Sequence, residues 1–188
     1  MSSSRSKKIT QSFKIVIFAL LSVILLLMLA NYVYKPRKYY QVVKKACETF
    51  DVDKFLILAI IKVESDFDRF AVSDKKACGL MQIRESTFNY VCEVYKLGYP
   101  DDSIFGVKEN VFAGTAYVDY LFKKFLTAQE VLAAYNAGEG VVKGWLKNDK
   151  YSADGITLNS FPFKETEKYV KKVLFYKNYY DRAFNHYH

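Results

Sequence analysis

Histidine is almost absent from this chain of 188 residues: only His186 and His188 occur, both at the extreme C-terminus. Catalysis by a Ser-His-Asp or Cys-His arrangement needs a histidine that the fold holds in place, so neither is expected. Cysteine is also scarce, at positions 47, 78 and 92. These positions allow no more than one disulfide and contain no Cys-x-x-Cys pair to bind zinc. We therefore expect no metal ion and no cofactor.

Acidic residues are absent from the first 34 positions, which contain the basic residues Arg5, Lys7, Lys8 and Lys14. This short segment therefore contributes half of the formal net charge of +8. The remaining residues are only mildly basic, and their charges of both signs are scattered. Such a distribution does not favour a surface dedicated to nucleic acid. It fits a loose attraction to a polyanionic polymer better, so we expect no nucleic-acid partner.

One long apolar run, IVIFALLSVILLLMLA at residues 15–30, contains a single polar residue, Ser22. With its flanks it is about 20 residues long, the length that a helix needs to cross a bilayer. No small-x-small cleavage site follows it, so an uncleaved anchor is favoured over a signal peptide. We predict a disordered basic tail at residues 1–12, a transmembrane anchor at 13–34 and a catalytic domain at 35–188.

The rest of the chain has the apolar periodicity of helices. The segment FLILAIIKVE, residues 55–64, is apolar on nearly every side and is expected to run through the core. Residues 109–125 and 129–137 repeat their apolar positions at helical intervals, and Gly138 is expected to end the second of these helices. A last helix is expected after Pro162. The sequence therefore predicts a mostly α fold.

Glu64 stands at the end of the most apolar of these helices. A carboxyl group in apolar surroundings has a raised pKa, because burial disfavours its ionised form. It can then donate a proton near neutral pH. The alternative is an acid that ends the helix and points into water, and position alone does not decide between the two.

Four segments in order favour the first interpretation: AIIKVESDFDRFAVS, ACGLMQI, AAYNAGEGVVKGW and FPFKETEKYVKKVL. Together they resemble the soluble lytic transglycosylase family over residues 40–180. The resemblance implies a lysozyme-like helical domain that cuts peptidoglycan glycan strands, with Glu64 as the catalytic acid. The other positions implied to contact the substrate are Ser73, Met81, Gln82, Tyr135, Asn136, Glu165 and Tyr169. Two departures occur beside the GLMQ stretch: Lys76 replaces a usual glycine, which puts the loop conformation in doubt, and Cys78 replaces a small residue.

The family reaction needs one carboxyl group. Protonated Glu64 would protonate the oxygen between N-acetylmuramic acid and N-acetylglucosamine, and the substrate's own acetamido group would take up the positive charge. Ionised Glu64 would then deprotonate the muramic acid 6-hydroxyl, which closes a 1,6-anhydro ring. Peptidoglycan as the partner places the catalytic domain outside the cell membrane and the N-terminus inside. Two alternatives remain: a hydrolytic muramidase similar to goose-type lysozyme, and a non-catalytic peptidoglycan-binding scaffold.

Overall fold

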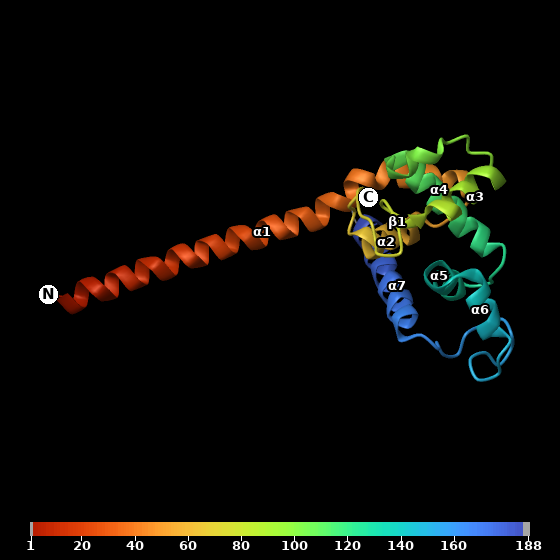
Figure 1. Ribbon diagram of the computed structural model, residues 1–188. Helices are drawn as coiled ribbons and strands as arrows, with labels where there is room; N and C mark the ends of the chain where they lie inside the picture. The colour runs from red at the N-terminus through yellow and green to blue at the C-terminus, as the bar shows by residue number, and fades with distance from the viewer. Residues whose placement is uncertain (1, 186–188) are drawn as a thin grey trace. The chain divides into compact units, whose positions relative to one another are not determined.

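The computed structural model describes the backbone of residues 2–185, and their side chains except for residues 2–10, 12, 13, 27–33, 101, 102 and 185. His186 and His188 lie outside this range. The chain forms two compact units, Met1–Tyr39 and Tyr40–His188. The elements of the second unit are mostly helices, so the predicted mostly α fold is confirmed (Figure 1).

Helix α1, Ser2–Phe50, supplies the whole of the first unit and the first element of the second. Its backbone includes residues 2–12, which the sequence suggested to be disordered. No glycine or proline occurs before Pro36 to stop the helix. The described apolar side chains between Ile15 and Leu26 are exposed.

The predicted anchor, residues 13–34, is not confirmed. Among the residues that the structure describes, no helix is both long and apolar enough to cross a membrane. The side chains of residues 13 and 27–33, which belong to the predicted span, lie outside the described set.

Helix α2, Lys54–Ser65, is the centre of the second unit. Asp53 caps its first turn, since its carboxylate accepts a hydrogen bond from the backbone N–H of Phe55 at 2.8 Å. Seven consecutive residues, Phe55–Ile61, are buried, as expected of a helix that is apolar on every side. Helix α2 packs mainly on α7, Lys164–Asn185, and the two lie side by side in Figure 1. The core therefore fixes the end of α2, where Glu64 lies.

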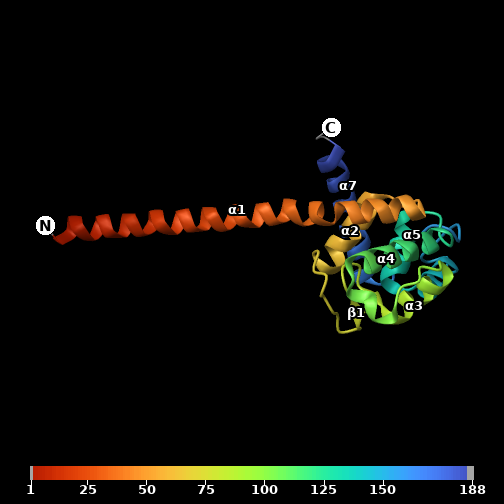
Figure 2. The ribbon, with the colours of Figure 1, turned by 90° about the horizontal axis from the view of Figure 1, so that it is seen from above.

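The other helices surround this pair. They are α3 (Glu85–Val94), the short 3-10 helix η1 (Asp101–Phe105), α4 (Val107–Phe122), α5 (Ala128–Ala137) and α6 (Glu139–Leu146). Figures 1 and 2 show α3 beside α4, and α5 beside α6. A small antiparallel sheet of β1, Ala77–Cys78, and β2, Ile83–Arg84, pairs Ala77 with Arg84 and Cys78 with Ile83. This hairpin carries the GLMQ stretch as its turn.

Glu130 anchors the long loop between α6 and α7 from inside the protein. Its side chain is fully buried, and its carboxylate accepts a hydrogen bond from the backbone N–H of Leu158 at 2.9 Å. Gln129 donates to the carbonyl of the same residue at 2.8 Å. Because a buried carboxylate needs such donors, Glu130 is satisfied by holding this loop in place.

Candidate active site

Glu64 lies near the C-terminal end of α2, where the buried part of the helix reaches the surface. Burial raises the pKa of its carboxyl group from 4.5 to about 7, and the nearby hydroxyl of Tyr169 opposes this rise in part. No second carboxylate is among the causes of the shift. At neutral pH Glu64 therefore exists in both protonated and ionised forms, as an acid that later acts as a base requires.

The first of two hollows beside Glu64 has a volume of about 440 Å³. It extends from Glu64 toward α3, α4 and the junction of α5 and α6, where Thr87, Tyr117 and Gly138 line it. Six of the eight residues implied by the resemblance line this hollow: Glu64, Ser73, Gln82, Tyr135, Asn136 and Glu165.

The second hollow, of about 550 Å³, shares Glu64, Ser73 and Gln82 with the first. It extends in another direction, toward Lys172 and Tyr176 of α7. Glu64 thus lies where the two hollows meet, so a polymer strand could extend into both hollows and pass Glu64 between them.

Met81 and Tyr169, the two remaining residues, are both buried next to the site. Met81 is fully buried and its side chain packs on Gly114 of α4, where an added Cβ would lie 2.8 Å from the methionine Cε. Tyr169 is 8% exposed, and its hydroxyl makes no hydrogen bond of standard geometry. Burial and the nearby Glu64 raise the pKa of Tyr169 well above its usual value. Neither residue lines either hollow, and their contact with the substrate stays a prediction.

Tyr135 of α5 is held by the GLMQ turn. Its hydroxyl donates a hydrogen bond to the backbone carbonyl of Met81 at 2.7 Å. Burial, followed by the charge of Glu64, raises the pKa of Tyr135 well above its usual value. The phenol therefore stays neutral beside Glu64, and its proton is committed to the turn.

Asn110 of α4, which the sequence analysis did not single out, fixes the same turn. It is 1% exposed; its carbonyl oxygen accepts from the backbone N–H of Met81 at 2.8 Å. Its amide nitrogen donates to the carbonyls of Cys78 at 3.0 Å and Ile104 at 2.8 Å. The signal for it was a polar residue beside the apolar stripe of α4. Its partners Met81 and Cys78 lie 29 and 32 positions away in the sequence, where periodicity gives no information.

Gly79 is needed for the fit of this turn around Asn110. Its φ is +76°, and a Cβ would lie 2.7 Å from Cγ of Asn110. We expect Gly79→Ala to lower the free energy of unfolding by at least about 2 kcal/mol, through the left-handed backbone and the clash together. Gly98→Ala is the control, because Gly98 has a φ of +67° and nothing within 4 Å of a Cβ. Equal losses in urea denaturation of the two variants would contradict a role for the contact with Asn110.

Gln82 and Ser73 hold the loop that borders both hollows. The amide nitrogen of Gln82 donates to the carbonyls of Ala71 at 2.9 Å and Gly79 at 3.0 Å, with the backbone of Gln82 at a φ of +47°. The Ser73 hydroxyl accepts from the N–H of Ala77 at 3.0 Å. Such strain at a non-glycine residue is typical of functional sites.

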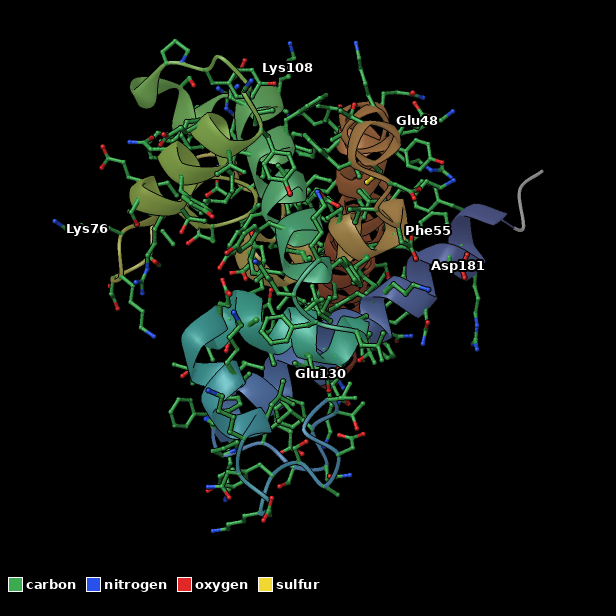
Figure 3. The ribbon with its side chains drawn as sticks, turned by 90° about the vertical axis from the view of Figure 1, so that its right-hand side faces the viewer. Glu48, Phe55, Lys76, Lys108, Glu130 and Asp181 are labelled. Atoms are coloured by element: carbon green, nitrogen blue, oxygen red, sulfur yellow. The ribbon has the colours of Figure 1, made fainter. Side chains whose placement is uncertain are left out.

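The loop before β1 keeps its turn although Lys76 stands in place of the usual glycine. The φ of Lys76 is +58°, so it adopts the left-handed conformation that glycine would favour. Its side chain is exposed at the tip of the loop before β1, away from the rest of the unit (Figure 3). The lysine therefore retains the turn at a cost in backbone strain.

Two further hydrogen bonds join the walls of the site. The hydroxyl of Ser65, next to Glu64, donates to the carbonyl of Leu80 at 2.8 Å and so ties α2 to the turn. The hydroxyl of Thr166 on α7 donates to the side-chain oxygen of Asn136 at 2.8 Å. Within the described residues, no group of three or more histidine, cysteine or acidic side chains is placed to hold a metal ion.

Comparison with known proteins places this geometry in a family. Residues 41–157 match the Transglycosylase SLT domain. Membrane-bound lytic murein transglycosylase C of Pectobacterium atrosepticum is 33% identical over 164 residues, which cover 74% of this chain and 45% of that protein. The 70-kDa soluble lytic transglycosylase of Escherichia coli superposes with a TM-score of 0.67 at 28% identity, covering 77% of this chain and 24% of that one.

An inactive Glu-to-Gln mutant of the lytic transglycosylase Slt from Pseudomonas aeruginosa superposes with a TM-score of 0.66 at 28% identity, covering 77% of this chain and 24% of that one. The chain thus spans less than half the length of these relatives. The match extends over more than half of the chain and includes the segment from Glu64 to Gln82. The chain therefore belongs to the Transglycosylase SLT domain family.

Proposed function

We propose that this protein is a peptidoglycan lytic transglycosylase that cleaves the β-1,4 bond between N-acetylmuramic acid and N-acetylglucosamine without water. The observation that carries the proposal is Glu64, a half-buried carboxyl group with a pKa of about 7 at the junction of two hollows. The related proteins named as lytic transglycosylases support the same activity. The glycan strand would lie across Glu64, with one part in each hollow.

In the first step, protonated Glu64 gives its proton to the glycosidic oxygen as the bond to the anomeric carbon breaks. The acetamido oxygen of the muramic acid attacks that carbon and takes up its positive charge. Tyr135 has committed its own proton to Met81, so toward Glu64 it can only accept a hydrogen bond. It can thereby orient the acid in its protonated form.

In the second step, ionised Glu64 removes the proton of the 6-hydroxyl, whose oxygen attacks the anomeric carbon and displaces the acetamido oxygen. The product is a 1,6-anhydro ring, and Glu64 is protonated again. The Tyr169 hydroxyl, which has no other partner of standard geometry, can donate to Glu64 while it is ionised. The intramolecular attack benefits from the high effective concentration of a hydroxyl on the same sugar.

The remaining polar groups fit the recognition of acetamido groups and hydroxyls. The amide nitrogen of Gln82 is used within the loop, which leaves its oxygen as an acceptor for an acetamido N–H. Asn136 uses its oxygen toward Thr166, which leaves its amide N–H groups as donors. Ser73 and Glu165 complete the polar lining of the first hollow.

The proposed reaction needs no second carboxyl group, because Glu64 serves first as the acid and then as the base. Retaining and inverting glycosidases instead use a pair of carboxyl groups about 5 to 9.5 Å apart. Asp74 and Glu165 also line the first hollow and are the residues that a hydrolytic reaction would have to use for this purpose.

Mass spectrometry of the products from purified peptidoglycan tests the proposal. We expect muropeptides with 1,6-anhydro ends, one water lighter than hydrolytic products. Reducing ends would instead identify a muramidase. Binding to peptidoglycan without release by the folded protein would identify a scaffold.

We further propose that residues 13–34 attach the protein to the cell membrane, with the N-terminus inside and residues 35–188 outside. The exposed apolar side chains between Ile15 and Leu26 and the membrane-bound relative support this attachment. The full chain is expected to sediment with membranes, while a chain of residues 35–188 stays in the supernatant. Equal sedimentation of both chains would overturn the anchor, and a reporter after residue 188 that is active only in the cytoplasm would overturn the orientation.

A further inference from the structure

One face of α7 lines the site from end to end. Glu165 lines the first hollow, Tyr169 lies next to Glu64, and Lys172 and Tyr176 line the second hollow. The spacings of four, three and four residues keep these side chains on one side of a helix. The chemistry of this face therefore changes along the groove, from an acid at one end to a cation at the other.

The second hollow combines one available cation with an apolar wall. Its other lysine, Lys62, is paired with Asp66 and lies 5.7 Å from the ring centroid of Tyr176. Lys172 is exposed and forms no ion pair with any described residue. The wall beside it includes Ala71 and Val72, of which Val72 is 61% exposed.

We infer that the second hollow binds the peptide stem of peptidoglycan and that Lys172 pairs with a stem carboxylate. This inference rests on the proposed function. While the stem is attached, the lactyl carboxyl group of each muramic acid is held in an amide bond, so the sugars offer no anion to a lone cation beside them. The stem begins with alanine followed by a glutamate whose α-carboxyl group is ionised unless it is amidated. The second hollow offers both kinds of contact that this part of the stem needs: apolar side chains at Ala71 and Val72 for the alanine methyl group, and the ammonium group of Lys172 for the carboxylate.

The magnitude of the effect is that of an exposed ion pair. Such pairs contribute modestly, and salt screens them. We expect Lys172→Ala to lower kcat/KM by about two- to fivefold on strands with free stem carboxylates. The loss should appear in KM, because this contact does not change during the reaction. Lys168→Ala is the matched control, because Lys168 is exposed on the same helix and lines neither hollow.

The test uses two glycan substrates with the full-length protein: strands whose stem glutamate α-carboxyl groups are free, and strands in which these groups are amidated. The Lys172→Ala defect is expected only on the first substrate and is expected to shrink in high salt. An equal defect on both substrates, or none on either, would overturn the inference.

Binding of the same strands to Glu64→Gln protein, with and without Lys172→Ala, separates this inference from the proposed function. If the wild-type protein releases nothing while Lys172 still discriminates carboxylate from amide in binding, the activity fails and the stem site stands. If binding shows no discrimination although turnover is normal, the stem site fails and the activity stands.

Discussion

Glu64→Gln is expected to reduce the release of 1,6-anhydro products by at least about 1,000-fold. General acid and base catalysis contributes about 10² to 10⁴ in rate, and here one residue would supply both steps. Glutamine has nearly the same shape, but it can neither give a proton to the glycosidic oxygen nor take one from the 6-hydroxyl. The quantity to measure is the rate of muropeptide release from purified peptidoglycan.

The fold should survive this change. Glu64 is held in a site that favours its neutral form, so a neutral isostere adds no unpaired charge. Circular dichroism and peptidoglycan binding by Glu64→Gln should match those of the wild-type protein. Glu165→Gln is a useful comparison, since Glu165 is exposed and only lines the first hollow. Substantial turnover by well-folded Glu64→Gln would refute the assignment of the catalytic acid.

The second large effect concerns pH. The pKa of Glu64 is about 7 in the folded protein, and 4.5 is the value expected in the unfolded chain. Between these values the folded state holds a proton that the unfolded state has lost, so the free energy of unfolding falls as the pH rises through this window. Above pH 7 the loss levels off at about 3 kcal/mol, which corresponds to the difference between the two pKa values. Turnover should also fall as the pH rises through about 7, because the protonated form of Glu64 starts the reaction.

Urea denaturation at several pH values, with wild-type and Glu64→Gln proteins side by side, isolates this contribution. All other titrating groups are common to the two proteins and cancel in the difference. The variant should become the more stable of the two as the pH rises from 4.5 to 7. A constant difference in the free energy of unfolding over this range would mean that folding does not raise the pKa of Glu64.

The sequence predicted the helices well where a single pattern was strong. The uninterrupted apolar run of α2, the stop of α5 at Gly138 and the helix after Pro162 are all present. The hairpin of β1 and β2 was not predicted, because strands of two residues are too short to show an alternation. The short motifs likewise identified six residues that line the first hollow.

The parts that the sequence missed depend on contacts between distant segments. The burial of Met81 follows from the close approach of Gly114, and the position of Asn110 follows from partners in the hairpin and in η1. The packing of α7 on α2 brings Tyr169 next to Glu64, although the two residues are more than 100 positions apart in the sequence. Neither local propensity nor spacing contains this information.

The burial of Glu64 also bears on inhibition. A sugar mimic with a fixed positive charge in place of the anomeric carbon would meet a neutral carboxyl group below pH 7 and an anion above it. Opposite charges attract strongly in a site shielded from water. Such an inhibitor would bind more tightly as the pH rises, over the same range in which the proposed turnover is expected to fall. Its potency would therefore be underestimated in an assay at the pH where turnover is expected to be fastest.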